Sequence, residues 1–214
     1  VGAEALLRWR LPGHGEIAPS QFIPLAEESR LILDIGAWVL NKVCSDYAEW
    51  QKRVSDPGLV AINLSLKELS QASFIPHCRS VFEKHGVSPS RVELEITETT
   101  LMLDAERTLP LLDELRAMGV HLSIDDFGTG YSSLSALQQF PIGTLKIDQS
   151  FVHDVPGDAN DVTLVRTIID MGRSLGMQVV AEGVETLEQL GFLRMAGCDF
   201  AQGRLFGDAI SLAF

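Results

Sequence analysis

The chain has 214 residues, of which 46% are hydrophobic and 21% charged, and its formal net charge is −12. This composition is typical of a folded globular protein and excludes a chain dominated by disorder. The acidic balance argues against a DNA or RNA duplex as partner, because contacts to backbone phosphates need Lys and Arg.

Two further features bear on location. The longest apolar run, Leu31–Leu40, is interrupted by Asp34 and falls short of the roughly 18 residues of a membrane helix, so no membrane segment is expected. The three cysteines, Cys44, Cys78 and Cys198, are odd in number and widely spaced. We expect buried thiols in the cytoplasm, or in a cytoplasmic domain of a membrane-anchored protein.

Short apolar runs alternate along the chain with amphipathic stretches of helical spacing. The runs predict seven strands, at Ala3–Arg8, Leu59–Leu64, Val92–Thr97, Val120–Ile124, Thr144–Ile147, Gln178–Ala181 and Cys198–Ala201. The amphipathic stretches predict helices at Leu31–Trp50, Ala105–Met118, Val162–Leu175 and Thr186–Met195.

This alternation indicates a mainly parallel α/β sheet, and seven strands without a second domain favour a TIM-like (β/α) barrel over residues 1–214. A barrel of eight strands would need one more strand. We therefore expect that this chain lacks the first N-terminal strand and belongs to a longer multidomain protein.

Polar side chains recur in or after the predicted strands, where the carboxyl ends of a parallel barrel share one face. They are Glu4, Asn63, Glu95, Glu98, Asp125, Asp126, Lys146, Asp148, Glu182, Glu185 and Gln202. Any one of them could instead be a helix N-cap, and Asp125-Asp126 could be an ordinary turn. Capping does not explain Glu4 and Glu95, because a carboxylate inside an apolar strand is costly unless it is paired or bound to metal.

Such a cluster of carboxylates with one amide suits Mg²⁺ or Mn²⁺ better than zinc, and none of the five histidines has the spacing of a metal ligand. More carboxylates than one ion needs suggest two ions, a known device for phosphodiester hydrolysis. Lys146 would add a fixed positive charge. The Gly-rich segment Gly128–Gly130, with its flanking residues through Ser133, is expected to be a mobile loop that closes over the metals, the alternative being a rigid connector.

The segment Glu4-Ala5-Leu6-Leu7-Arg8-Trp9 resembles the signature of the EAL domain family of cyclic di-GMP phosphodiesterases. The resemblance continues over essentially the whole chain, in Asn63-Leu64-Ser65, Glu95-Ile96-Thr97-Glu98, Asp125-Asp126-Phe127-Gly128-Thr129-Gly130-Tyr131-Ser132-Ser133, Lys146-Ile147-Asp148, Glu182-Gly183-Val184-Glu185-Thr186 and Gln202-Gly203.

The resemblance implies roles for individual residues. Glu4, Asn63, Glu95, Asp125 and Asp126 would bind two metal ions. Glu182 would position or deprotonate the attacking water, with Lys146 as its partner. The implied substrate contacts are Leu6, Arg8, Asp148 and Gln202. Strand alternation with Glu4 and Leu6 also predicts that Arg8 faces the site. Glu98 would anchor the loop that carries Asp125 and Asp126, and Glu185 would support the site.

The implied reaction is Mg²⁺- or Mn²⁺-dependent hydrolysis of cyclic di-GMP to linear pGpG, with Ca²⁺ inhibitory. The signature Glu4, both aspartates and the loop are retained, which favours an enzyme. The alternatives are a receptor that binds cyclic di-GMP without hydrolysis and a regulatory domain whose partner is another protein. The family also implies a homodimer and additional sensory or cyclase domains. The chain departs from the common family pattern at Arg204, where an aromatic residue is usual, and near Ala209, where a Pro is usual.

Overall fold

The computed structural model describes residues 2–103, 105–130 and 134–210. The chain divides into two compact units, Val1–Leu94 with Glu114–His121, and Glu95–Asp113 with Leu122–Phe214. No helix in the described part of the chain is both long and apolar enough to cross a membrane.

The first unit contains a strand pair, a hairpin and a layer of helices. Its elements are β1 (Gly2–Ala5), β2 (Trp9–Leu11), β3 (Gly15–Ile17), α1 (Pro19–Ser29), α2 (Ile32–Gln51), β4 (Leu59–Asn63), α3 (Leu66–Leu69), α4 (Phe74–His85) and η1 (Pro89–Arg91). Strand β1 pairs in parallel with β4, and β2 pairs with β3 as an antiparallel hairpin.

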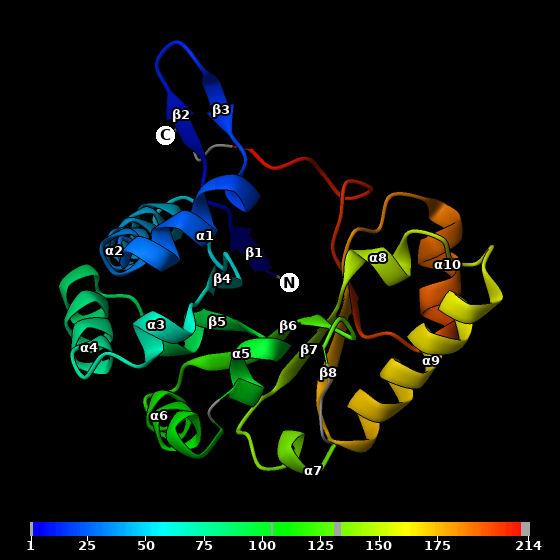
Figure 1. The fold of residues 1–214 in the computed structure, drawn as a ribbon. Helices are drawn as coiled ribbons and strands as arrows, with labels where there is room; N and C mark the ends of the chain where they lie inside the picture. Colours follow the sequence, from blue (N-terminus) through cyan, green and yellow to red (C-terminus); the bar gives the residue numbers. More distant parts are fainter. Residues whose placement is uncertain (1, 104, 131–133, 211–214) are drawn as a thin grey trace. The chain divides into compact units, whose positions relative to one another are not determined.

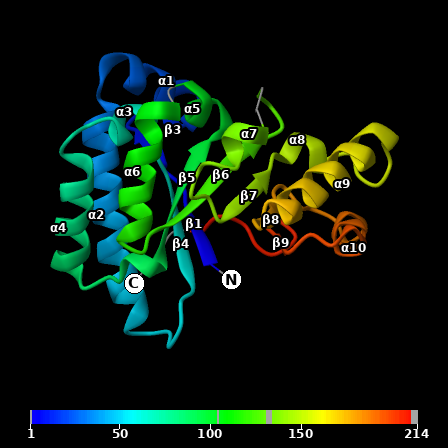
Figure 2. The same ribbon diagram turned by 90° about the horizontal axis from the view of Figure 1, so that it is seen from below.

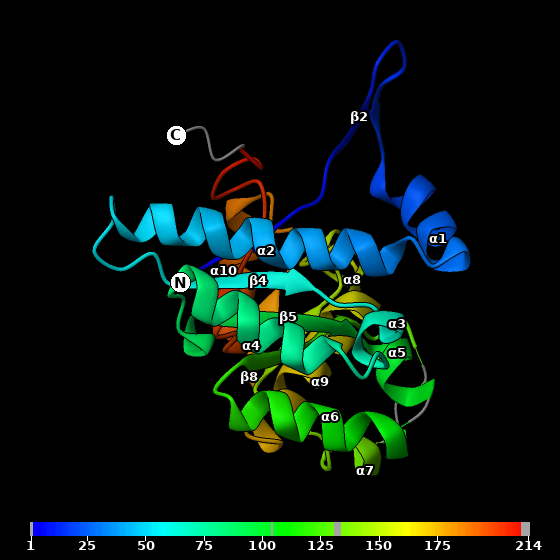
Figure 3. The ribbon, with the colours of Figure 1, turned by 90° about the vertical axis from the view of Figure 1, so that its left-hand side faces the viewer.

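Helices α2 and α4 pack against each other beside β4 (Figure 3). Their interface buries Cys44 and Cys78 completely, and burial raises the pKa of each thiol to about 12. Both thiols therefore stay protonated, and the prediction of buried free thiols is confirmed for them, whereas Cys198 is only partly buried.

The second unit is built from parallel strands and covering helices. Its elements are α5 (Glu98–Leu103), β6 (His121–Phe127), α7 (Leu134–Leu137), β7 (Thr144–Ile147), α8 (Gln149–Val152), α9 (Ala159–Ser174), β8 (Gln178–Ala181), α10 (Leu187–Ala196) and β9 (Phe200–Ala201). Strand β5 (Val92–Thr97) and helix α6 (Ala105–Ala117) each have residues in both units, and the first residue of β6, His121, belongs to the first unit.

Strands β6, β7, β8 and β9 pair in sequence order and in parallel (Figures 1 and 2). Helix α9 packs against β7 and β8. The hydrogen-bonded order of the seven strands is β1-β4-β5-β6-β7-β8-β9. Each predicted strand has its counterpart there, so the predicted parallel β/α architecture is confirmed.

Local sequence explains where the helices near the strand ends begin. The Thr186 hydroxyl accepts a hydrogen bond from the Gln189 amide, and the Gln189 side chain accepts one from the Thr186 amide, which forms a capping box at α10. Asp158 likewise accepts bonds from two amides at the start of α9. The four predicted helices correspond to α2, α6, α9 and α10 within a few residues.

Two predictions about the strands are corrected, and one hairpin was not predicted. Strand β1 ends at Ala5, so Leu6 and Arg8 lie beyond it and their predicted alternation with Glu4 does not hold. Strand β6 extends to Phe127, so Asp125 and Asp126 lie within the strand and do not follow it. The hairpin β2–β3 was not predicted, because each of its strands has only three residues.

Candidate metal and active site

A β-bulge in the second unit sets the position of the two adjacent aspartates. Ile124 pairs with Leu145 and Phe127 with Ile147, so three steps along β6 match two along β7. Asp125 and Asp126 therefore stand opposite the single residue Lys146. Asp126 has a positive φ of 53°, a conformation that aspartate tolerates better than most residues.

The bulge brings both aspartates to the same side of the strand. In a regular strand, neighbouring side chains point to opposite faces. Here one carboxylate oxygen each of Asp125, Asp126 and Glu182 lies within 4.8 Å of the others. Among the residues that the structure describes, these three carboxylates therefore form a group that could hold a metal ion.

Lys146 lies at the centre of the acidic cluster. Its Nζ is 2.6 Å from Oε1 of Glu95, 2.6 Å from Oε1 of Glu182 and 3.5 Å from Oδ1 of Asp125. The exposed fractions of the Lys146 and Glu95 side chains are 3% and 1%. One buried ammonium among several carboxylates leaves an excess of negative charge, which is unfavourable in a buried site unless further cations bind.

The donor set fits a hard divalent cation. Oδ1 of Asp125 is buried, and apart from its 3.5 Å ion pair with Lys146 it has no hydrogen-bond partner among the described residues. A buried carboxylate oxygen without a hydrogen bond is costly, and an oxygen-preferring ion such as Mg²⁺ or Mn²⁺ would offset that cost. Asp125, Asp126 and Glu182 could thus hold a metal ion, with Glu95 joined to them through Lys146.

The electrostatics of Asp126 agree with this reading. Burial, and after it the neighbouring carboxylates of Asp125 and Asp148, raises the pKa of Asp126 to about 6, while Lys146 acts in the opposite direction. Like charges crowded together disfavour the ionised form. A bound cation would remove this penalty, because a ligating carboxylate must be deprotonated.

Glu98 connects the end of β5 to the segment that follows β6. Its carboxylate, 2% exposed, accepts hydrogen bonds from the amides of Gly128 at 2.9 Å and Gly130 at 3.3 Å. An added Cβ at Gly130 would lie 3.1 Å from that carboxylate, so the contact is close. Tyr131, Ser132 and Ser133 of the predicted loop lie outside the residues that the structure describes.

The turn that carries Glu182 is held against the segment after β9. Val184 donates its amide to Gln202 O at 2.9 Å, and Leu205 donates its amide to Val184 O at 3.1 Å. The Arg204 side chain donates from Nη1 to Oε1 of Glu185 at 3.2 Å. This pair was not predicted, because no spacing rule predicts a contact between residues 19 positions apart.

Asp148 has a structural role that the sequence left open. It caps α8, accepting hydrogen bonds from the amide and the hydroxyl of Ser150. Its carboxylate also contributes to the raised pKa of Asp126. Asp148 thus both starts a helix and contacts the acidic cluster.

The remaining predicted residues belong to the first unit. Asn63, at the end of β4, donates from Nδ2 to Oε1 of Glu4 on β1 at 2.9 Å. Leu6 is 46% exposed. Arg8 forms an ion pair with Glu16 of the hairpin, with Nε 3.4 Å from Oε1.

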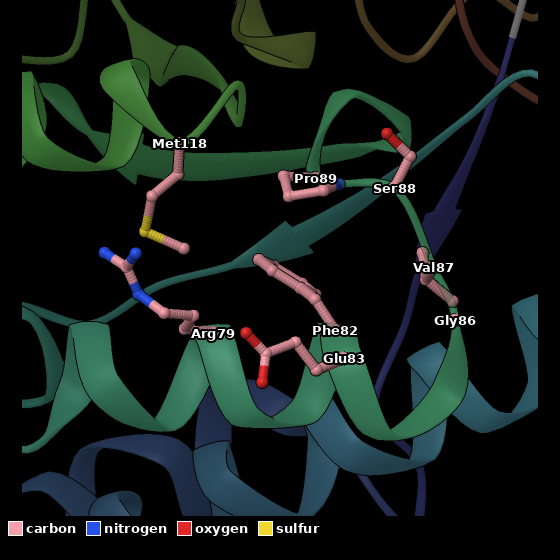
Figure 4. Close-up of a pocket in the computed structure, with 8 residues that line it drawn as sticks. All are labelled: Arg79, Phe82, Glu83, Gly86, Val87, Ser88, Pro89 and Met118. Carbon is pink, nitrogen blue, oxygen red and sulfur yellow. The ribbon is translucent and has the colours of Figure 1, made fainter.

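A pocket of about 450 Å³ also lies in the first unit (Figure 4). It is lined by Arg79, Phe82, Glu83, Gly86, Val87, Ser88, Pro89 and Met118. These residues come from the end of α4, the following loop and the segment before β6, at the amino ends of the strands. None of the predicted site residues lines it, so this pocket is separate from the acidic cluster's residues in sequence and carries none of the predicted chemistry.

Known proteins are similar to this chain in sequence and fold. The sequence profile of the EAL domain family matches residues 1–209. The bifunctional diguanylate cyclase/cyclic di-GMP phosphodiesterase MucR of Pseudomonas aeruginosa is 45% identical over 207 residues, covering 97% of this chain and 30% of that protein. The cyclic di-GMP phosphodiesterase NbdA of the same organism is 43% identical over 210 residues, covering 98% and 27%. The chain thus spans less than a third of either relative.

Solved structures agree. The phosphodiesterase PaMucR, in complex with c-di-GMP, matches with a TM-score of 0.94 at 44% identity, covering 98% of this chain and 85% of that chain. The EAL enzyme Bd1971, in a form bound to cAMP and cyclic-di-GMP, matches with a TM-score of 0.93 at 35% identity, covering 98% and 57%. This chain belongs to the EAL domain family and has its TIM-like β/α fold.

Proposed function

We propose that this domain hydrolyses one phosphodiester bond of cyclic di-GMP to give linear pGpG, using two Mg²⁺ or Mn²⁺ ions. The observation that carries the proposal is the convergence of the Asp125, Asp126 and Glu182 carboxylates beside the buried Lys146 ammonium. The relatives named as cyclic di-GMP phosphodiesterases support the choice of substrate.

Each residue of the cluster has a proposed task. Glu95, Asp125 and Asp126 would hold the metal ions, which would supply Lewis-acid activation of the phosphate and of the attacking water. Glu182 orients the attacking water and accepts its proton. Lys146 fixes Glu182 and Glu95 through its two short contacts and offers a positive charge to the developing phosphorane.

Further roles rest on the family resemblance. Glu4 and Asn63 are proposed as metal ligands, and Leu6, Arg8, Asp148 and Gln202 as substrate contacts. Glu98 is proposed to anchor the segment after β6 and Glu185 to support the Glu182 turn. Inhibition by Ca²⁺, a homodimer and additional domains in a longer protein also remain proposals.

The central test separates binding from chemistry at Glu182. Glu182→Gln keeps size and hydrogen-bonding capacity but loses the charge that holds the water. We expect it to bind cyclic di-GMP in Ca²⁺ and to hydrolyse it at least about 10²-fold more slowly in Mn²⁺. The matched control is Glu188→Gln, an exposed glutamate on α10, which should hydrolyse at the wild-type rate.

The metal assignment has its own test. Asp125→Ala and Glu95→Ala should abolish Mn²⁺-dependent release of pGpG, followed by chromatography. Glu4→Ala and Asn63→Ala, assayed separately, test the pair in the first unit. Wild-type turnover in Asp125→Ala would contradict the metal site. Tight binding of cyclic di-GMP by the wild type without turnover in Mg²⁺ or Mn²⁺ would identify a receptor instead of an enzyme.

A further inference from the structure

Arg204 places a guanidinium at the carboxyl end of β9 without burying it. The exposed fractions of the side chains of Arg204 and its partner Glu185 are 76% and 43%. An exposed ion pair of this kind contributes little to stability, because water and salt screen it. Stability alone therefore gives no reason for an arginine here, and a side chain that is 76% exposed is accessible to a ligand.

The backbone fixes where this guanidinium can reach. The segments Ala181–Val184 and Gln202–Leu205 are joined by three backbone hydrogen bonds, Gln202 to Ala181, Val184 to Gln202 and Leu205 to Val184. Gly203 approaches so closely that an added Cβ would lie 2.3 Å from Val184 N and O. Arg204 is thus held beside the turn that carries Glu182, the residue proposed to act on water.

The ion pair with Glu185 favours a neutral hydrogen-bond acceptor over a charged phosphate as the ligand group of Arg204. The carboxylate offsets the arginine charge, so the pair as a whole exerts little attraction on a phosphate. The planar N–H donors that do not face Glu185 keep their fixed geometry, which matches two neighbouring neutral acceptors. Guanine presents such acceptors at O6 and N7, whereas adenine replaces O6 by an amino donor.

We infer that Arg204 reads a guanine base of the dinucleotide by donating two hydrogen bonds to O6 and N7, with Glu185 as the residue that orients it. This rests on the proposed function, because the base must belong to a substrate bound at the Glu182 site. Arg204 then determines selectivity for guanine over adenine, and the metals and Glu182 carry out the hydrolysis.

The test compares three ligands and four proteins. Cyclic di-GMP, its 7-deazaguanine analogue and cyclic di-AMP are titrated in Ca²⁺ by calorimetry and assayed for hydrolysis in Mn²⁺. The proteins are the wild type, Arg204→Ala, Arg204→Lys and the control Arg194→Ala, which removes an exposed arginine from the last turn of α10 in the same unit. Melting temperatures confirm that all four fold.

We expect Arg204→Ala to bind cyclic di-GMP about tenfold more weakly and to lose a similar factor of selectivity over cyclic di-AMP, the usual effect of one bidentate base contact. The 7-deaza analogue should weaken binding to the wild type but not further to Arg204→Ala. Arg204→Lys should resemble Arg204→Ala, because an ammonium cannot serve both acceptors, and Arg194→Ala should resemble the wild type.

Three results would overturn the inference. Unchanged selectivity in Arg204→Ala would show that the side chain does not read the base. If Arg204→Ala weakens the binding of both dinucleotides equally and Arg204→Lys restores it, the contact depends on charge alone. Failure of the wild type to bind or hydrolyse cyclic di-GMP would overturn the proposed function as well, and this outcome is visible before any variant is compared.

Discussion

Nζ of Lys146 and Oε1 of Glu95 lie 2.6 Å apart between side chains that are 3% and 1% exposed. The same ammonium contacts Glu182 at 2.6 Å. A buried charge that loses its partner is far more costly than an exposed one. Lys146 is therefore needed both to hold Glu182 in place and to offset the mutual repulsion of the carboxylates.

Replacing Lys146 should expose this dependence. Lys146→Met keeps the length of the side chain but removes its charge, and we expect the metal-free protein to lose about 3–5 kcal/mol of unfolding free energy. Mn²⁺ should restore more stability in this variant than in the wild type, because the ion compensates the uncovered carboxylates. Urea denaturation with EDTA or with Mn²⁺ measures both effects.

The control for that experiment is Lys42→Met. Lys42 pairs with Asp46 on the surface of α2 and its side chain is 52% exposed, so its loss should cost less than about 1 kcal/mol. Equal stability of the Lys146 and Lys42 variants would show that the buried contacts do not carry the expected charge interaction.

The raised pKa of Asp126, about 6, predicts a pH dependence of stability without metal. The folded protein holds this proton more tightly than the unfolded chain. The resulting stabilisation is complete below about pH 4, near the ordinary pKa of aspartate, and is lost as the pH rises through about 6. Asp126→Asn should remove this fall in the metal-free protein.

The same proton competes with metal. Below about pH 6, the affinity for Mn²⁺ should fall about tenfold per pH unit, because the ion must displace one proton. Calorimetric titrations with Mn²⁺ from about pH 5 to about pH 7, which brackets that pKa, measure how the affinity changes with pH. An exposed aspartate on α9, Asp170, provides the control Asp170→Asn. If Asp126→Asn shows the same dependence of Mn²⁺ affinity on pH as Asp170→Asn, a group other than Asp126 titrates.

Gly203 is predicted to be indispensable to the Glu182 turn. In Gly203→Ala the new methyl group would overlap the Val184 backbone, 2.3 Å away, and separate the two segments. We expect a loss of about 1–3 kcal/mol together with a fall in kcat, since Glu182 moves with the turn. Gly191→Ala is the control, because nothing lies within 4 Å of its added Cβ. A Gly203 variant with wild-type kcat would show that the turn holds its place without this contact.

Two serines should respond to alanine in opposite directions. The Ser123 hydroxyl on β6 is buried and has no hydrogen-bond partner among the described residues, so Ser123→Ala should leave stability unchanged or raise it. Ser65 forms a capping box with Glu68 at α3, so Ser65→Ala should cost about 1 kcal/mol. Urea denaturation of both variants decides the point, and a clear loss in Ser123→Ala would indicate an ordered water bound to that hydroxyl.

The sequence by itself determined the order of the elements and the family. Apolar runs and helical spacing located all seven strands of the larger sheet and four of the helices, because these periodicities are properties of the local backbone. The same patterns placed four residues at or near strand ends: Glu95, Asp125, Lys146 and Glu182. This placement needs only the bounds of each strand in the sequence.

Only the tertiary structure decided how those side chains meet. Asp125 and Asp126 converge because one extra residue in β6 forms a bulge opposite Lys146, and a bulge is defined by the pairing of two strands. The predicted alternation of Glu4 with Leu6 and Arg8 was wrong because β1 ends at Ala5. Arg204 contacts Glu185 next to the close approach of Gly203 to Val184. Such contacts join distant parts of the chain, and local periodicity carries no information about them.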